Sequence, residues 1–248
     1  MERKPEYSVV IPVYNSEKTL VELHSRLAGV MSGMEGGYEI ILVDDGSRDG
    51  SWAVMANLSS EDDGVKAIRL AGNFSQHNAL LCGFRHARGE YVITLDDDLQ
   101  NPPEEIPKLV ERLMEGYDAV YGVWEKSYQP LHRRLISIIG RRILSLVTGI
   151  DATGLTTFRA IRRPVVDAVL AFESRYVNLG AYISLSSKKT ASVKVKHQPR
   201  REGGSNYTLG KLLEFAFTFI MAALALRFGI FSGASGQPYS ISEIEGFD

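Results

Sequence analysis

Residues 91–103 hold an apolar run that ends in three consecutive carboxylates: Tyr91-Val92-Ile93-Thr94-Leu95-Asp96-Asp97-Asp98-Leu99-Gln100-Asn101-Pro102-Pro103. The apolar part predicts a β-strand, which the Pro-Pro pair prevents from continuing. Because side chains alternate along a strand, we expect Asp96 and Asp98 on one face and Asp97 on the other. Two carboxylates on the same face repel each other unless a cation or a proton lies between them. The stretch therefore indicates a site for a hard divalent ion whose shell is completed by substrate phosphates.

Apolar runs and amphipathic stretches alternate on both sides of this stretch. The predicted strands are residues 8–13, 38–43, 65–70, 91–95 and 119–123, and predicted helices include about 16–31, 76–87 and 104–115. This alternation is typical of βαβ units, so we expect an α/β fold with a mostly parallel sheet flanked by helices. Ligands of such sheets bind beyond the carboxyl ends of the strands, which favours a binding role for the aspartates. The alternative is a solvated acidic loop that caps the next helix, because Glu104 and Glu105 suit a helix N-terminus.

The overall composition is that of a soluble globular protein, with 44% hydrophobic residues, 23% charged residues and a net charge of −2. Such a charge gives no global basic field, so no nucleic-acid partner is expected. A single cysteine, Cys82, excludes an internal disulfide framework and fits a reducing compartment. The N-terminus lacks the apolar stretch of a signal peptide. These features predict a cytoplasmic protein.

The second half of the chain is less regular. Residues 133–147 are predicted to be helical, residues 151–162 to form an edge strand or a loop, and residues 191–196 to form an exposed strand. The loop from Arg200 to Tyr207 is basic and contains two glycines. Basic residues also cluster at Arg133 and Arg134, which suggests discrete sites for anions.

An apolar segment follows, with twelve apolar or weakly polar residues at 215–226. A membrane-spanning helix needs about 20 such residues, so we predict a helix at 211–231 that lies in the membrane interface. The alternatives are a core or dimer-interface helix, which could pair two copies into a homo-oligomer, and a single membrane-spanning helix. Residues 232–248 are polar and acidic and are predicted to be disordered. The expected division is a catalytic domain at 1–210, the apolar helix at 211–231 and the tail at 232–248.

Four features occur in order along the chain, three of them at predicted strand ends. They are Ile11-Pro12-Val13-Tyr14-Asn15, Val43-Asp44-Asp45-Gly46-Ser47, residues 96–103 and the loop Arg200 to Tyr207. Together they resemble the family 2 glycosyltransferases of the GT-A fold, which is Rossmann-like. Within that family they are most similar to the polyprenyl-phosphate glycosyltransferases, which include dolichol-phosphate mannose synthase and bacterial undecaprenyl-phosphate sugar transferases.

The resemblance implies an inverting, Mg²⁺- or Mn²⁺-dependent glycosyltransferase. Its donor would be a nucleotide-diphosphate sugar and its acceptor a polyprenyl phosphate, at the inner face of the membrane in cell envelope biogenesis. The metal would be held by Asp98 and Gln100 with help from Asp96, and would neutralise charge on the departing diphosphate. The donor nucleotide would bind to residues of the first three features, namely Pro12, Tyr14, Asn15, Asp44, Asp45, Asp96 and Asp97. For the pair Asp44-Asp45 the alternative is a helix N-cap with Asp-Gly turn chemistry.

The loop Arg200 to Tyr207 is similar to the family pattern Arg-x-x-Gly-x-Ser-Lys-Tyr, although Asn206 replaces the lysine. The resemblance implies that Arg200 and Ser205 donate to the diphosphate and act in catalysis together with Asp96 and Asp98. Arg133 and Arg134 fall where the family keeps arginines for the acceptor phosphate. The segment Asn73 to Asn78 is similar to the family's Gly-Gln-x-Ala.

The chain departs from its relatives at residues 153–159, which contain no acid where many relatives carry an aspartate before Gly-Phe-Arg. A phosphate acceptor is already an anion near neutral pH, so no catalytic base is required for it. Two other functions stay open. One is transfer to a saccharide hydroxyl, which would need a carboxylate base. The other is a non-catalytic, membrane-associated nucleotide-binding scaffold, which fits Asn206 but not the intact acidic cluster.

Overall fold

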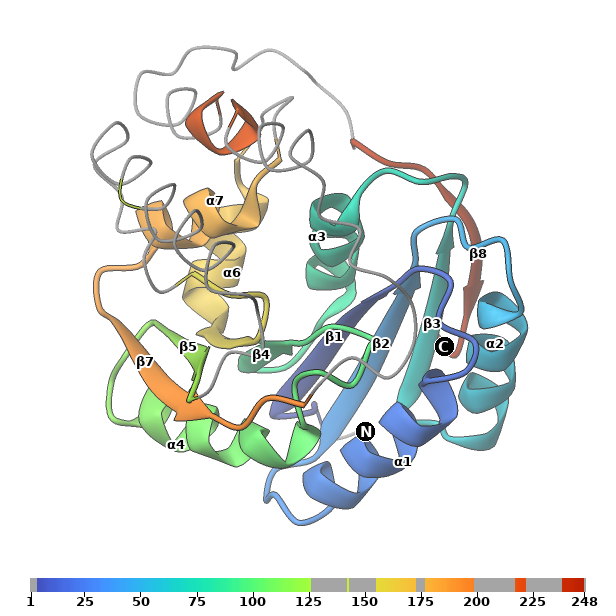
Figure 1. The fold of residues 1–248 in the computed structure, drawn as a ribbon, viewed down its shortest axis with the longest axis horizontal. Coiled ribbons are helices and arrows are strands. Elements are labelled where there is room, and N and C mark those ends of the chain that lie inside the picture. Colours follow the sequence, from blue (N-terminus) through green and yellow to red (C-terminus); the bar gives the residue numbers. More distant parts are fainter. Residues whose placement is uncertain are drawn as a thin grey trace.

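In the part of the chain that the structure describes, one mixed sheet of eight strands organises the fold (Figure 1). The computed structural model of the chain describes residues 4–125, 142, 155–172, 177–198, 217–221 and 238–247. The strands are β1 (Tyr7–Val13), β2 (Tyr38–Asp44), β3 (Val65–Leu70), β4 (Tyr91–Thr94), β5 (Ala119–Trp124), β6 (Arg159–Arg162), β7 (Thr190–Val195) and β8 (Ile241–Glu245). The helices are α1 (Leu20–Met31), α2 (Ser51–Glu61), α3 (Gln76–His86), α4 (Ile106–Met114), α6 (Arg163–Leu170), α7 (Leu179–Ser186) and the short 3₁₀ helix η1 (Pro103–Glu105).

The strand order is β7-β5-β6-β4-β1-β2-β3-β8. β6 and β8 run antiparallel to their neighbours, and the other six strands run in one direction. The prediction of a mostly parallel α/β sheet is therefore confirmed. The segment 151–162 was expected to give an edge strand or a loop, but β6 lies inside the sheet between β5 and β4.

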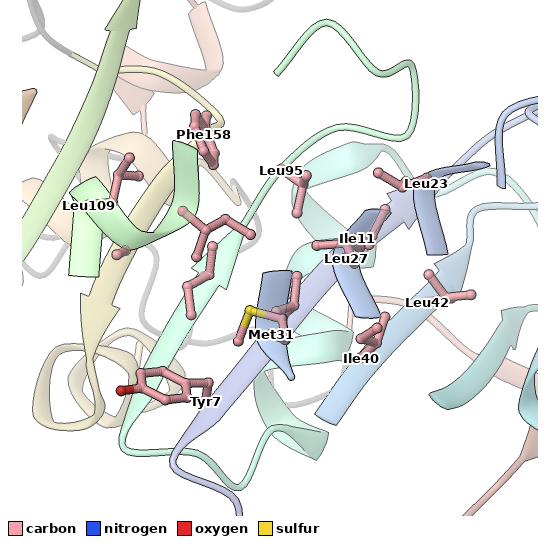
Figure 2. Packing of buried hydrophobic residues seen from close by; sticks show 14 of the residues in the cluster. Tyr7, Ile11, Leu23, Leu27, Met31, Ile40, Leu42, Leu95, Leu109 and Phe158 are labelled. Atoms are coloured by element: carbon pink, nitrogen blue, oxygen red, sulfur yellow. The ribbon is translucent and has the colours of Figure 1, made fainter. Parts of the chain in front are cut away.

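Helices cover both faces of the sheet, with α1, α2 and α4 on one face and α3, α6 and α7 on the other (Figure 1). The apolar residues Leu20, Leu23, Leu27 and Met31 are buried along one side of α1. Figure 2 shows part of this packing, where α1 residues lie over Ile11 of β1 and over Ile40 and Leu42 of β2. β1 is buried along its whole length, as expected for a central strand covered on both faces.

Residues 241–245 correct the expectation of a disordered tail, because they form β8 along the outer edge of β3. Glu243 accepts hydrogen bonds from Arg69 Nη1 (2.8 Å) and Trp52 Nε1 (3.1 Å), and Tyr239 is buried just before the strand. Composition could not predict this pairing. The residues of β8 are exposed, and the strand is held mainly by pairing with the edge of β3.

The predicted apolar helix at 211–231 is described only at residues 217–221, which are helical. Phe219 is buried with α7 residues such as Leu179 and Tyr182, whereas the side chain of Phe217 is 55% exposed. In the part of the chain that the structure describes, no helix is both long enough and apolar enough to cross a bilayer.

Candidate functional site

The carboxyl ends of β1, β2 and β4 meet at one edge of the sheet. The register pairs Val13 with Asp44 and Val10 with Thr94, so the loops after these strands lie beside one another. The chain runs from β1 to β2 and β3 on one side and then places β4 on the other side of β1. Ligands of open α/β sheets bind where the strand order reverses in this way. Three of the four sequence features, at residues 12–15, 44–47 and 96–100, come together at this point.

The strand that leads to the carboxylates is shorter than expected. β4 ends at Thr94, so Asp96, Asp97 and Asp98 lie in the turn after it and not on the strand. The alternation of strand side chains therefore does not set their directions, which corrects the sequence argument. Leu99 sets the shape of the turn instead: its side chain is buried in the core and its φ is +60°, a left-handed conformation that L residues avoid.

Asp97 connects the turn to the loop after β1. Its Oδ2 accepts hydrogen bonds from the Tyr14 backbone N–H (3.0 Å) and from the Ser16 hydroxyl, and Thr19 Oγ1 donates to its carbonyl oxygen (2.7 Å). Burial raises the pKa of Asp97 to about 6, although the bonds from Ser16 and Tyr14 oppose the shift. Asp97 thus holds two loops of the predicted donor pocket together.

Asp96 is held by side chains from two other elements. Gln76 Nε2 donates to its Oδ1 and Thr157 Oγ1 donates to its Oδ2, each at 2.6 Å. Burial raises the pKa of Asp96 to about 6, and the negative charge of Asp98 adds to the shift. The bonds from Thr157 and Gln76 and the positive charge of Arg159 act in the opposite direction.

Asp98 and Gln100 flank Leu99 at the tip of the turn. Asp98 Oδ1 accepts a hydrogen bond from the Gln100 backbone N–H at 3.1 Å. The charge of Asp98 also acts on His197, whose pKa is nevertheless lowered because burial dominates. His197 follows β7, so the acidic turn lies near the end of that strand.

Two further contacts fasten the acidic turn to β5 and β7. Trp124 Nε1 donates to Asn101 Oδ1 at 3.0 Å, and the Trp124 ring stacks on His197 with centroids 3.8 Å apart. The backbone N–H of Gln198 donates to the Gln100 carbonyl at 2.9 Å. These contacts bring the end of β7 to the metal-binding turn predicted from the sequence.

The two aspartates after β2 have different surroundings. Asp44 is fully buried; its Oδ1 accepts from the Ser47 N–H (2.8 Å) and its Oδ2 lies 3.4 Å from Arg69 Nε. This geometry supports the turn alternative for Asp44. Asp45 Oδ1 accepts from the Phe74 N–H at 2.6 Å, and burial raises its pKa to about 6. Its contact with a nucleobase stays a prediction.

The loop after β1 provides the other predicted donor residues. Pro12 is buried within β1 opposite Val43, and the Tyr14 side chain is 43% exposed beside the turn. The Asn15 N–H donates to Ser47 Oγ (2.9 Å), which ties this loop to the one after β2. The remaining predicted residues, Arg133, Arg134, Arg200 and Ser205, lie outside the described residues.

The donor set fits an open site for a hard divalent ion. Asp98 and Gln100 bring oxygen ligands to one turn, and the mutual repulsion of Asp96 and Asp98 favours a nearby cation. Within residues 4–125 and the other described ranges, no three His, Cys, Asp or Glu side chains form a closed metal site. Such a turn leaves room in the shell for phosphate oxygens of a substrate.

Sequence reasoning missed several residues that build this site. Gln76 and Thr157 donate to Asp96, and Trp124 donates to Asn101 of the turn while its ring packs against His197. Gln76 belongs to a segment whose family likeness was visible, but nothing in that segment shows which carboxylate it contacts. Thr157 and Trp124 carry no sequence signal, because the sheet brings them to the site from distant parts of the chain.

Comparisons with known proteins give a consistent result. The model of the family described as Glycosyl transferase family 2 matches residues 8–170. Undecaprenyl-phosphate 4-deoxy-4-formamido-L-arabinose transferases are similar in sequence. The protein from Shewanella sediminis is 40% identical over 86% of this chain and 65% of its own length, and that from Pseudomonas paraeruginosa is 40% identical over 86% and 63%. The chain thus spans less than two thirds of the length of these relatives.

Solved structures share the fold. Glucosyl-3-phosphoglycerate synthase from Mycobacterium tuberculosis, in complex with Mn²⁺, UDP and phosphoglyceric acid, has a TM-score of 0.64 at 19% identity, covering 96% of this chain and 86% of that one. S. aureus TarS in complex with UDP-GlcNAc has a TM-score of 0.61 at 18% identity, covering 89% and 66%. At these identities the likeness establishes the architecture alone.

Proposed function

The chain belongs to glycosyl transferase family 2, and we propose that it transfers a sugar from a nucleotide-diphosphate sugar to a polyprenyl phosphate. The observation that carries the proposal is the meeting of the acidic turn after β4 with the loops after β1 and β2. The turn would bind the diphosphate and the two loops would bind the nucleoside, at the point where the strand order of the sheet reverses. The names of the sequence relatives support undecaprenyl phosphate as the acceptor and 4-deoxy-4-formamido-L-arabinose as the first sugar to test.

Each part of the site has a role in this reaction. Asp98 and Gln100 would hold a Mg²⁺ or Mn²⁺ ion, which when bound would stabilise the negative charge of the leaving diphosphate. Tyr14, Asn15 and Asp45 would surround the nucleoside. Arg200 and Ser205 would donate to the diphosphate oxygens, and Arg133 and Arg134 would bind the acceptor phosphate.

The reaction is an in-line displacement with inversion. An acceptor phosphate oxygen forms a bond to the anomeric carbon while the bond from that carbon to the diphosphate breaks, and the electron pair leaves with the nucleotide. Because the attacking oxygen is already anionic, no side chain has to remove a proton. This agrees with Asp96 and Asp97, whose carboxylates already accept hydrogen bonds from the protein.

A peripheral association with the inner face of the membrane completes the proposal. Phe219 anchors the helical residues 217–221 to the core, while Phe217 is exposed. An apolar side chain held at the surface beside an apolar segment favours contact with a lipid interface. The same segment could instead pair two copies of the chain, and sedimentation of the pure protein separates the two.

The test is product formation by the purified chain with undecaprenyl phosphate, Mn²⁺ and a panel of UDP- and GDP-sugars, followed by mass spectrometry of the lipid fraction. Asp98→Asn keeps the acceptor for the Gln100 N–H and removes the charge, so we expect a loss of turnover on the order of 10²-fold or more. Glu111→Gln, on the exposed side of α4, is the matched control. Sugar found only on a free oligosaccharide, or donor binding without any transfer, would contradict the proposal.

A further inference from the structure

The carboxylate of Asp96 lies between α3 and the residues that lead into β6. Each oxygen accepts one side-chain hydrogen bond of 2.6 Å, Oδ1 from Gln76 and Oδ2 from Thr157. Hydrogen bonds to an ionised carboxylate are among the stronger ones in proteins. The orientation of Asp96 is therefore fixed by two donors, Gln76 and Thr157, that are far apart in sequence.

Thr157 is itself held by the sheet. Thr94 Oγ1, at the end of β4, donates to the Thr157 carbonyl at 2.5 Å. Thr156 Oγ1 lies 3.1 Å from the Gly122 carbonyl of β5 and 2.9 Å from the Phe158 carbonyl. The Thr157 hydroxyl thus extends from a backbone that is tied to strands on both sides, and it forms a rigid support for Asp96.

A buried cation also acts on the same carboxylate. Arg159 is only 3% exposed, its Nε donates to Thr94 Oγ1 at 3.2 Å, and its charge attracts Asp96. Gln76 is exposed at the start of α3. Asp96 is therefore held by two hydrogen bonds, one from the residues that lead into β6 and one from an exposed helix end, and by the charge of Arg159.

We propose that Thr157 and Gln76 are positioning residues that fix the orientation of Asp96 within the acidic turn, and that they act on the chemical step through Asp96. This inference rests on the proposed transferase function. One hydrogen bond to each oxygen fixes the plane of the Asp96 carboxylate relative to Asp98, its neighbour in the turn. The inference predicts that Thr157 and Gln76 affect the chemical step more than they affect the binding of the donor.

The experiment is a set of double-mutant cycles on the full chain. Thr157→Val and Gln76→Met keep the side-chain size and remove the hydrogen-bonding groups. Each should lower kcat about 10-fold to 100-fold while the KM for the donor changes less than threefold, whereas Thr157→Ser should keep at least a third of the wild-type kcat. In an Asp96→Asn background, the additional effect of either change should fall below threefold because the charged partner is already lost. Thr190→Val, at an exposed position of β7, is the control for the loss of a threonine hydroxyl.

Two outcomes would overturn the inference. One is a kcat for Thr157→Val and Gln76→Met within twofold of the wild type. The other is full additivity with Asp96→Asn. Thermal unfolding of the same variants gives a readout that does not need activity, since the destabilisation by Thr157→Val should also be smaller in the Asp96→Asn background. If the wild-type chain fails to transfer sugar while this thermal coupling is present, the proposed function fails and the contact of Thr157 with Asp96 stands.

Discussion

Replacement of Ser75 by glycine should stabilise the protein. Ser75 precedes α3, and its backbone has φ of 87° and ψ of 151°. Residues other than glycine rarely adopt this combination. Its hydroxyl does not cap the helix, and its contact with Asn78 Nδ2 is long at 3.5 Å. The substitution Ser75→Gly therefore removes backbone strain and loses little in return.

The expected gain follows from two opposing effects. Relief of the strained conformation is worth about 1–3 kcal/mol. The greater freedom of glycine in the unfolded chain costs about 0.5–1 kcal/mol. The net stabilisation is about 1 kcal/mol, which corresponds to a rise in Tm of about 2–4 °C for a chain of this size.

Differential scanning calorimetry of the wild type, Ser75→Gly and Ser25→Gly measures this effect. Ser25 is exposed in the middle of α1, so glycine there should lower the Tm by reducing helix propensity. An unchanged or lower Tm for Ser75→Gly, with Ser25→Gly behaving as expected, would refute the argument. The substitution also falls within the candidate site, because Ser75 lies between Phe74, whose N–H donates to Asp45, and Gln76, whose side chain donates to Asp96.

Three more predictions concern pH, packing and the membrane. The pKa of Asp45 rises from 3.8 to about 6 on folding. The stability that comes from this group is therefore complete below its pKa in the unfolded chain and is lost as the pH rises through about 6. Asp45→Asn should show a smaller fall in Tm than the wild type between about pH 4 and 7. Gly83→Ala should lower the Tm, because the added Cβ would lie 2.2 Å from Val10 Cγ1, and an overpacking cost of about 1–3 kcal/mol exceeds the gain in helix propensity. Gly29→Ala, which meets nothing within 4 Å in α1, should raise the Tm and serves as its control. Phe217→Asp should reduce co-flotation with anionic vesicles and leave the Tm unchanged, since this side chain is exposed.

The parts of the fold that follow from apolar periodicity were predictable. β1, β2, β3 and β5 lie within a residue or so of the predicted strands, because long buried runs of Val, Ile and Leu give an unambiguous signal. β6 has the sequence Arg-Ala-Ile-Arg and is too short and too polar to indicate a central strand. β8 was missed because its residues are exposed and its stability comes from a neighbour far away in sequence.

The candidate site was predictable only as a set of motifs. The sequence placed three acidic and polar loops at strand ends, and the structure brings them to one edge of the sheet. The directions of individual carboxylates were not accessible, since they depend on where β4 ends and on the left-handed conformation of Leu99. The hydrogen bonds from Gln76 and Thr157 to Asp96 were equally unpredictable. Threonine and glutamine occur in many environments, and only the tertiary structure brings these two to Asp96.

The two outermost strands of the sheet carry opposite charges. β7 contains Lys194, whereas β8 contains Glu243 and Glu245. Two molecules that met through two β7 edges or through two β8 edges would bring like charges together, which disfavours these two pairings. Loss of β8 would remove this protection and leave the backbone of β3, with its row of unpaired amide and carbonyl groups, as a template for a foreign strand. The last residues of the described chain therefore cover a sheet edge that would otherwise be open to pairing, at the opposite end of the sheet from β7.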